Sequence, residues 1–258
     1  MNKVQLSVVI LAKNEETRIA HCINSVCGWA EEIIVVDDES TDRTKDIAEG
    51  LGAGVVTKKM EIEGRHRNWA YLQGKFEWIL SMDADERLTD GLKKEIGEAL
   101  SAGPKCSAFT IPRKNFIRDY WIKGGGLYPS PQLKLFKKNK FKWEEVEVHP
   151  RAFLTGECGH LTGDLLHYTY RNWEDFIGKL NRQTTLEAKK WYKLSLEDPK
   201  RAGYKMNTLH ALWRVLDRFI RTFFFKKGYK DGFVGFMVAY FASMYQIVSY
   251  AKYRELKK

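Results

Sequence analysis

Acidic residues are nearly missing from the last part of the chain. The 258-residue sequence carries 43 Lys and Arg against 33 Asp and Glu, which gives a net charge of +10. Residues 1–199 hold 30 of each sign, so residues 200–258, with 13 basic and 3 acidic residues, carry the whole excess. This asymmetry predicts a neutral body with a basic appendage for an anionic surface, and it argues against a uniformly basic nucleic-acid binder.

Paired cysteines and a secretory signal are also missing. The four cysteines, Cys22, Cys27, Cys106 and Cys158, form no C-x-x-C pair, and reduced thiols are then the default. The first apolar run, residues 8–12, is too short for the core of a signal peptide, and charged residues follow it at once. We therefore expect the protein to be made and kept inside the cell. A hydrophobic content of 44% excludes a disordered chain.

Short β-branched runs alternate with helical patterns in the first hundred residues. Strands are predicted over residues 6–12, 32–37, 54–57 and 77–82, the first two buried. One helix is predicted from Glu15 to about Trp29, and residues 40–44 supply turn and N-cap residues before a second helix that runs to about Leu51. This alternation predicts the α/β class, with a mostly parallel central sheet flanked by helices. Residues 107–168 predict short strands and long loops, and the pattern is helical from Trp173 onward.

Polar residues follow three of these strands at the point where each strand ends. They are Asn14 and Glu15, then Asp37 and Asp38, and finally Asp83 and Asp85. In open α/β sheets, ligands bind beyond the carboxyl ends of the strands. The sequence therefore predicts a ligand site where these three clusters converge.

Asp83 and Asp85 are separated by one residue, so both side chains lie on the same side of an extended chain. Carboxylate oxygens suit Mg²⁺ or Mn²⁺, and Mg²⁺ is usually held by one or two carboxylates together with substrate phosphates. The alternative is a solvated turn, because a D-x-D pattern often occurs by chance. The preceding buried strand favours the metal site.

The other candidates have structural alternatives of the same kind. Asp38 is suited to accept hydrogen bonds from a ribose or a base edge, or else to cap the next helix. Asn14 and Glu15 mark either the ligand site or the entry to a helix. Arg65 and Asn68 are candidates to contact a base or phosphate, or are surface residues that open a helix.

Together these motifs resemble those of inverting family 2 glycosyltransferases. Later segments are similar to the subgroup that builds the bacterial lipopolysaccharide core with β-glucosyl transfer. The resemblance covers roughly residues 4–170 and implies a GT-A (nucleotide-diphospho-sugar transferase) fold, a UDP-sugar donor and a divalent cation, Mg²⁺ or Mn²⁺. The segments that carry it are residues 7–16, 32–44, 65–68, 78–86, 112–116, 125–129, 133–136 and 148–149.

The resemblance also implies roles for single residues on the donor side. Asn14, Glu15 and Arg65 would lie near the nucleotide, and Asn68 is grouped with them as a nucleotide-sugar residue. Asp38 would contact uracil or ribose. Asp83 would lie near the ribose and the metal, and Asp85 would bind the cation. His167 is a further candidate metal ligand, or else a histidine packed at the end of a strand.

The expected base is a carboxylate just before the Val148-His149 step. Glu145 matches the family's Asp best and Glu144 is the second choice, although Glu is longer than Asp by one methylene. Pro150 replaces the usual Glu, and Lys134 replaces a frequent Arg, which is not equivalent at a bidentate site. The candidate acceptor residues are Arg113, Asn115 and Gln132.

The basic C-terminal region has two apolar helical patterns. Large apolar residues recur at helical spacing from Leu209 to Phe224, with arginines on another stripe, which is typical of an amphipathic helix at a membrane interface. Residues 232–251 then carry no formal charge and are long enough to span a bilayer. Their polar and glycine residues favour monotopic docking, and a helical hairpin packed on the protein is the third alternative.

These observations predict a hexosyltransferase that moves a sugar, expected to be glucose, from a UDP-sugar to a lipid-linked saccharide such as lipopolysaccharide core. We expect a catalytic domain over residues 1–199, with a nucleotide-sugar half to about 106, an acceptor half over 107–170 and a connecting helix over 173–199. Residues 200–258 would be a membrane-associating helical region at the cytoplasmic face of the inner membrane. The rivals are a polyprenyl-phosphate glycosyltransferase and a non-catalytic nucleotide-sugar-binding membrane protein.

Overall fold

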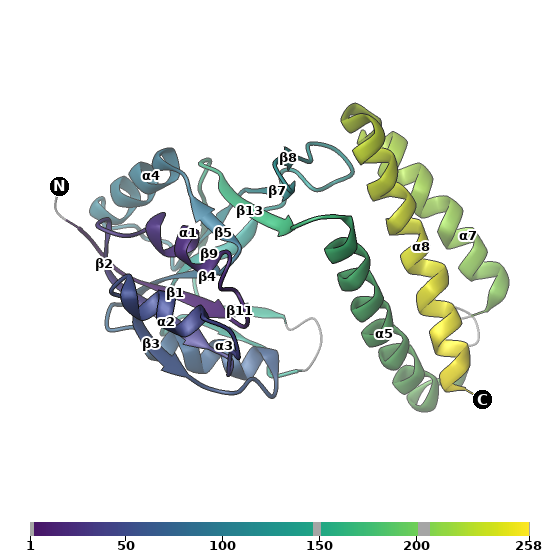
Figure 1. Cartoon of the computed structure of the whole chain (residues 1–258), viewed down its shortest axis with the longest axis horizontal. Coiled ribbons are helices and arrows are strands. Elements are labelled where there is room, and N and C mark those ends of the chain that lie inside the picture. The colour runs from purple at the N-terminus through teal and green to yellow at the C-terminus, as the bar shows by residue number, and fades with distance from the viewer. Residues whose placement is uncertain (1–2, 147–150, 201–206, 258) are drawn as a thin grey trace. The chain divides into compact units, whose positions relative to one another are not determined.

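The computed structural model describes residues 3–146, 151–200 and 207–257 of the chain (Figure 1). The chain divides into two compact units, one formed by residues 1–113 and 131–167 and the other by residues 114–130 and 168–258. These units divide the chain differently from the expected boundary at residue 199, which stays a prediction about function. Each unit is described by itself below.

The first unit is built around a seven-stranded sheet in the order β12-β6-β9-β4-β1-β2-β3. The pairs β1–β2, β1–β4, β2–β3 and β12–β6 are parallel, whereas β9 runs antiparallel to both β4 and β6. This confirms the predicted mostly parallel sheet. The strands of the sheet are β1 (Val4–Ala12), β2 (Ala30–Asp37), β3 (Gly54–Thr57), β4 (Trp78–Asp83), β6 (Ala108–Ile111), β9 (Gln132–Lys137) and β12 (Cys158–His160).

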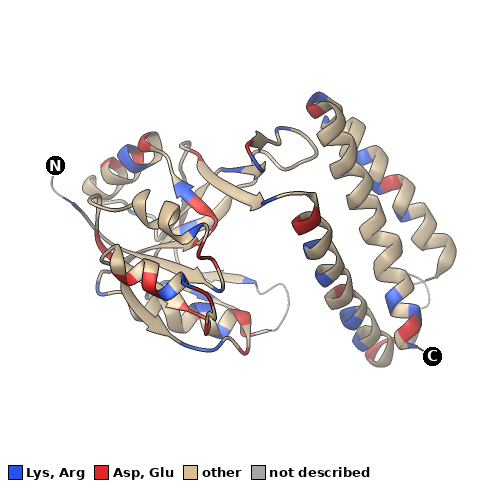
Figure 2. Cartoon of the chain, in the orientation of Figure 1, with Lys and Arg blue, Asp and Glu red and all other residues tan. Residues whose placement is uncertain are grey.

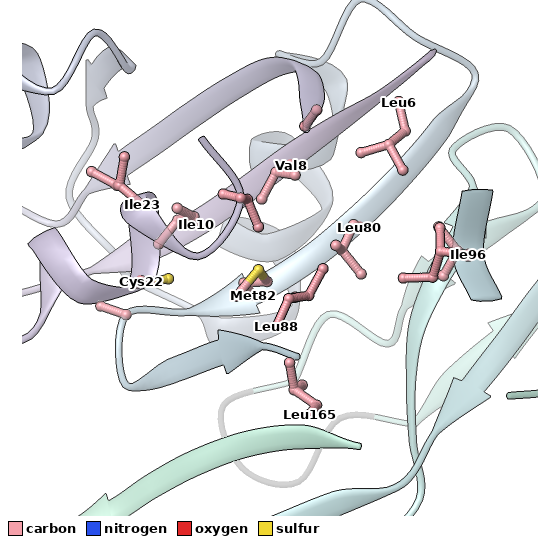
Figure 3. Close-up of a cluster of buried hydrophobic side chains, with 14 of the residues drawn as sticks. Leu6, Val8, Ile10, Cys22, Ile23, Leu80, Met82, Leu88, Ile96 and Leu165 are labelled. Atoms are coloured by element: carbon pink, nitrogen blue, oxygen red, sulfur yellow. The ribbon is translucent and has the colours of Figure 1, made fainter. Parts of the chain in front are cut away.

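The helices of the first unit pack on both faces of this sheet. Alternate residues of the central strand β1 enter two different clusters: Leu6, Val8 and Ile10 lie on the face covered by α1 and α4, and Val9 lies on the face covered by α3. Figure 3 shows the first of these clusters around Leu80 and Met82 of β4. The helices are α1 (Ile19–Asn24), α2 (Thr44–Gly50), α3 (Glu63–Leu72) and α4 (Asp90–Ser101). Burial on both faces explains why these strands read as continuous apolar runs.

Helix α1 is much shorter than the predicted helix from Glu15 to Trp29. Asn14 has a φ of 54°, a left-handed conformation that Asn tolerates better than most residues. The backbone N–H groups of Glu15 and Glu16 donate to side chains of the loop before α2, namely Thr44 Oγ1 and Asp42 Oδ2. These contacts tie the segment after β1 to the loop before α2, and the regular helix begins only at Ile19.

Smaller strands complete the sheets. Strand β5 (Glu86–Leu88) pairs antiparallel with the start of β13 (Leu165–Tyr170), within the order β5-β13-β7-β8, and β10 (Phe141–Trp143) pairs antiparallel with β11 (Ala152–Leu154). Strands β7 (Arg113–Ile117) and β8 (Tyr120–Trp121) form a hairpin. The expectation of short strands and long loops in this part of the chain is therefore confirmed.

The second unit is mainly helical. Helix α8 packs on both α5 and α7. Asp231, which is buried, accepts hydrogen bonds from the backbone N–H groups of Lys123 and Gly124 at 3.1 and 2.6 Å, and so fastens the loop after β8 to the start of α8. The helical elements are α5 (Trp173–Glu197), α7 (Thr208–Ile220), the π-helical turn η1 (Arg221–Phe225), the 3₁₀ turn η2 (Gly228–Asp231) and α8 (Gly232–Leu256).

Candidate active site

The polar clusters predicted at the strand ends do converge. In the parallel register, Ala12 lies opposite Asp37, and Leu11 lies opposite Asp83. The carboxyl ends of β1, β2 and β4 therefore lie side by side at one edge of the sheet. This places Asn14, Asp38 and Asp83 on three adjacent strand ends, as the sequence predicted.

Asn14 and Glu15 shape the loop that leaves β1. The backbone N–H of Asn14 donates to Ser40 Oγ at 2.9 Å, and its side-chain Oδ1 accepts from the Thr41 N–H at 2.8 Å. The Glu15 carboxylate accepts two hydrogen bonds from Arg18, at 2.6 and 2.7 Å. Asn14 thus ties together the loops after β1 and β2, and Glu15 orients Arg18.

Asp38 lines a pocket of about 210 Å³ together with Lys13, Met60, His66 and Arg67. Its carboxylate accepts hydrogen bonds from Lys13 Nζ at 2.9 Å and from the Met60 N–H at 2.7 Å. Burial alone would raise the pKa of Asp38, but these two hydrogen bonds and the Lys13 charge lower it below its usual value. Asp38 does not cap α2, because Asp42 accepts the Thr44 N–H there instead.

The arginine that faces this pocket is Arg67, and not the predicted Arg65. Arg65 lies on the outer side of α3, with a side chain 56% exposed, and its Nε donates to Glu145 Oε2 at 3.0 Å. Arg67 lines the pocket and donates to Asp83 Oδ1 at 3.2 Å. His66 also lines the pocket, and burial lowers its pKa against the opposing charge of Asp38.

Asn68 is engaged by the backbone of β10. Its Nδ2 donates to the Trp143 carbonyl at 2.9 Å, and its Oδ1 accepts from the Trp143 N–H at 2.8 Å. Both ends of the amide are therefore used to hold β10 against α3. This geometry gives Asn68 a structural task in place of the nucleotide contact that the sequence predicted.

A buried lysine that the sequence analysis assigned to the acceptor side lies between two carboxylates of the β4–β5 segment. Lys134 Nζ, on β9, is 2.9 Å from Asp83 Oδ2 and 2.7 Å from Glu86 Oε2. Glu86 is fully buried and also accepts the Asp83 N–H at 2.9 Å. Burial would lower the pKa of Lys134, but Asp83 and Glu86 raise it, so the lysine stays charged. Lys134 and Arg67 in turn overcome the effect of burial on Asp83 and hold the pKa of that carboxyl far below its usual range.

Asp85 has a different set of partners. Its Oδ1 is 3.4 Å from His167 Nε2, and its Oδ2 is 3.7 Å from Arg18 Nη1. Burial would raise the pKa of Asp85, but the His167 hydrogen bond and charge, with Arg18, lower it. His167 therefore lies beside the second aspartate of the D-x-D pair, where the sequence analysis put a candidate metal ligand.

The donor set fits a divalent cation that is shared with a substrate. Within the described residues, no group of three or more His, Cys, Asp and Glu side chains is arranged to enclose a metal ion. Asp83 is paired with Arg67 and Lys134, and Asp85 is paired with His167 and Arg18. A cation held by Asp85 and His167 would replace their mutual contact of 3.4 Å with one oxygen and one nitrogen ligand. Few protein ligands are expected where diphosphate oxygens complete the coordination.

The two candidate bases lie directly after β10, over the start of α3. A Cβ on Gly64 would lie 1.9 Å from the Glu144 carbonyl oxygen, so only glycine permits this close approach. Glu144 Oε2 accepts from the Arg151 N–H at 3.3 Å, whereas Glu145 is half exposed and paired with Arg65. Val148, His149 and Pro150, which helped to locate the base in the sequence, lie outside the described residues.

The three candidate acceptor residues have different local partners. Arg113 Nη1 is 3.6 Å from the buried Glu86 Oε1, and Gln132 lies at the start of β9, paired with Ile111 in the sheet. Asn115 belongs to the second unit, where its Nδ2 donates to the Leu127 carbonyl at 2.6 Å and its Oδ1 accepts from Thr169. Asn115 is buried and fastens a loop, because its amide is occupied at both ends.

Replacing the buried lysine tests the ionic network. We predict that Lys134→Met lowers the free energy of unfolding by about 3–5 kcal/mol at neutral pH, because it leaves two carboxylates without their buried cation. Asp83 has a depressed pKa when folded, so its contribution is present above about pH 4 and is lost as the pH falls further. Urea denaturation at several pH values measures both effects.

The exposed lysine Lys140 supplies the matched control. Lys140→Met should change the stability by less than about 0.5 kcal/mol. A Lys134→Met protein as stable as this control at pH 7 would contradict the network. So would a stability difference that grows, and does not shrink, below about pH 4.

Comparison with known proteins agrees with this geometry. The chain is 28% identical over 272 residues to an uncharacterised glycosyltransferase of Rickettsia prowazekii, covering 98% of this chain and 87% of that protein. It is also 28% identical over 258 residues to the lipopolysaccharide core biosynthesis glycosyltransferase LpsC of Rhizobium meliloti, covering 97% of this chain and 92% of that protein.

Solved structures give more distant matches. Staphylococcus aureus TarS 1–349 aligns with a TM-score of 0.48 at 14% identity, over 98% of this chain and 91% of that chain. Glucosyl-3-phosphoglycerate synthase of Mycobacterium tuberculosis, in complex with Mn²⁺, UDP and glucosyl-3-phosphoglycerate, aligns with a TM-score of 0.35 at 26% identity, over 45% of each chain.

The family assignment comes from the sequence itself. The model of the family described as "Glycosyl transferase family 2" matches residues 7–155, which is more than half of the chain and includes every strand end of the candidate site. The predicted resemblance and the GT-A fold are thereby confirmed. The protein belongs to glycosyltransferase family 2 and is a glycosyltransferase with a GT-A fold.

Proposed function

We propose that this glycosyltransferase transfers a sugar from a UDP-sugar to a hydroxyl of a lipid-linked saccharide, with inversion at the anomeric carbon. The observation that carries the proposal is the pocket of about 210 Å³ that is lined by Asp38, directly after β2, and by Arg67 of α3, which is hydrogen-bonded to Asp83 at the end of β4. A nucleoside needs a carboxylate that accepts its hydrogen bonds, and a diphosphate needs cations. Both kinds of group are present at this edge of the sheet.

The nucleotide is held by groups of opposite charge. Asp38 is ionised, because hydrogen bonds from Lys13 and Met60 lower its pKa, and it lines the pocket, which suits it to accept hydrogen bonds from uracil or ribose. Lys13 and Arg67 line the same pocket and supply positive charge for phosphate oxygens. Asn14 and Glu15 shape the loop beside the pocket, and their role is to position the backbone that forms the pocket wall. Asp83, fixed by Arg67 and Lys134, lies at the ribose end.

A divalent cation, Mg²⁺ or Mn²⁺, would be held by Asp85 with His167 as a second ligand. When bound, such a cation neutralises charge on the diphosphate of the departing UDP. Glu15 orients Arg18, and Arg18 contacts the far oxygen of Asp85. These contacts fix the direction in which the Asp85 carboxylate faces.

Glu145 is the proposed base. It takes the proton of the acceptor hydroxyl while the hydroxyl oxygen bonds to the sugar C1, and the bond from C1 to the phosphate oxygen breaks to release UDP. Glu145 Oε2 lies 3.0 Å from Arg65 Nε, and the Glu145 side chain is half exposed, so an acceptor hydroxyl has access to it. Glu144 is the second choice, because its carboxylate is already bonded to the Arg151 N–H.

The acceptor proposal draws on LpsC, whose name assigns it to lipopolysaccharide core biosynthesis. A lipid-linked saccharide is the acceptor class that follows, with UDP-glucose as the proposed donor and Arg113 and Gln132 as candidate contacts. Such an acceptor is anchored in a bilayer, which puts the reaction at the cytoplasmic face of the inner membrane.

A panel of nucleotide sugars tests this function. We predict that the purified protein releases UDP from a UDP-sugar when Mn²⁺ and a lipid-linked saccharide are both supplied, and that it releases no GDP from GDP-sugars. Transfer only to polyprenyl phosphate would overturn the acceptor proposal. Nucleotide binding without UDP release from any donor would overturn the catalytic proposal, because a mere binding protein breaks no glycosidic bond.

Removing the base should separate catalysis from binding. We predict that Glu145→Gln lowers the rate of transfer by at least about 100-fold, because a general base typically contributes that much, while UDP affinity stays within about twofold. Glu144→Gln is the matched control and should retain most of the activity. Transfer at the wild-type rate by Glu145→Gln would show that Glu145 is not the base.

A further inference from the structure

Helix α8 leaves several large apolar side chains of its first half exposed. The residues that it buries are mostly small or polar, and they include Gly235, Ala239, Ser243, Gln246 and Ser249. Phe233 is 70% exposed, and Phe236 and Tyr240 are more than 40% exposed. A helix of a water-soluble core shows the opposite arrangement, with its apolar stripe turned inward.

Small buried residues allow the backbones of the second unit to approach closely. A Cβ on Gly235 would lie 1.8 Å from the Gly228 carbonyl oxygen. Ser243 Oγ donates to the carbonyl groups of its own helix, at Ala239 and Tyr240. Interfaces made of Gly, Ala and Ser are typical of helices whose outer surface contacts lipid.

Helix α7 and the turn η1 repeat this pattern. Ala211 and Thr222 are buried, whereas Leu209 is 81% exposed and Phe225 is 77% exposed. Aromatic contacts join the elements, because Phe219 and Phe223 lie 5.8 and 6.2 Å from Phe236 of α8 between ring centroids. We call the exposed set the apolar face; it consists of Leu209, Leu212, Trp213, Leu216, Phe224, Phe225, Phe233, Phe236 and Tyr240.

Positive charge borders this face and negative charge is scarce. Arg221 and Lys226 line a shallow groove with Trp213, Leu216 and Phe225, and Lys227 and Lys230 are exposed nearby. Of the two acidic residues in this stretch, Asp217 is paired with Arg221 at 2.6 Å and Asp231 is buried. Figure 2 shows α8 with almost no charge between its two ends.

We propose that the apolar face docks on a bilayer that contains anionic phospholipid, with α7, η1 and the start of α8 lying in the interface. The docking proposal rests on the proposed function, because a lipid-linked acceptor requires a membrane, and it names the surface of the protein that contacts the membrane. Apolar side chains enter the acyl boundary, while the bordering lysines and arginines meet the phosphates. Trp213 and Tyr240 suit this level because their rings are amphipathic.

Two other occupants fit the same face less well. In a symmetric dimer formed through this face, the basic residues of one copy would face those of the other, and like charges oppose such contact. A transmembrane span would take α8 alone; Gly228–Leu256 is long and apolar enough by composition. However, Lys252 Nζ donates to Asn181 Oδ1 and Thr184 Oγ1 of α5, which holds α8 against a helix with charged residues along its length.

Vesicle co-sedimentation of the full chain tests the proposal. We predict that the wild-type protein binds vesicles that contain phosphatidylglycerol, and that a Leu212→Ser, Leu216→Ser, Phe233→Ser variant binds about tenfold more weakly or worse. A Lys226→Gln, Lys230→Gln variant should lose about tenfold on the anionic vesicles and lose little on neutral phosphatidylcholine.

The chain offers a matched control for the apolar variant. Leu72 and Leu196 are 68% and 67% exposed but belong to α3 and α5, which contribute no residue to the apolar face. Leu72→Ser with Leu196→Ser should therefore bind vesicles like the wild type. Circular dichroism and UDP release report on folding and on catalysis independently of docking.

Several results would overturn the docking proposal. Equal vesicle binding by the wild type and the apolar variant would do so. A wild-type protein that is a dimer and does not bind vesicles, with a monomeric apolar variant, would also do so. Retention of the wild type in membranes through alkaline carbonate extraction would favour a span, whereas release supports interfacial docking. Loss of UDP release with vesicle binding intact would count against the proposed function alone.

Discussion

The buried cation of Lys134 is the constraint on which the candidate active site depends. It joins the end of β4 to Glu86 in β5 through contacts of 2.9 and 2.7 Å, and it comes from the antiparallel strand β9. A lysine without partners in such a position would be strongly destabilising, and so would either carboxylate alone. The trio keeps Asp83 ionised and leaves Asp85 facing His167. These two buried ion pairs therefore fix the position of the Asp83 carboxylate at the end of β4.

Much of the fold was predictable because local sequence and tertiary structure agree. The strands that lie in the middle of the sheet are buried on both faces, so they read as continuous apolar runs and were located to within a few residues. The parallel order of β1, β2 and β4 then brings Asn14, Asp38 and Asp83 together. The family assignment confirms the GT-A fold that these motifs predicted.

The sequence could not predict side-chain direction, because spacing alone does not determine it. Arg65 and Arg67 are two positions apart on α3 and so point to different sides of the helix, but nothing in the sequence says which one faces the pocket. The side chains of Asn68 and Asn115 hydrogen-bond to backbone carbonyl groups. Lys134 lies beside Asp83 because β9 pairs antiparallel with β4. In α8, the sequence likewise did not show that Gly235, Ala239 and Ser243 face inward, because residues 232–251 stood out only by their lack of charge.

The most direct test of the account is a calorimetric titration of UDP with and without Mn²⁺, in the wild type, Asp38→Asn and Arg65→Gln. The account predicts that UDP binds in the presence of Mn²⁺, that Asp38→Asn weakens binding by about tenfold or more, and that Arg65→Gln leaves it unchanged, since a hydrogen bond to a charged group contributes about 1.5–3 kcal/mol. Failure of the wild type to bind UDP would contradict it. So would a loss of affinity in Arg65→Gln with none in Asp38→Asn.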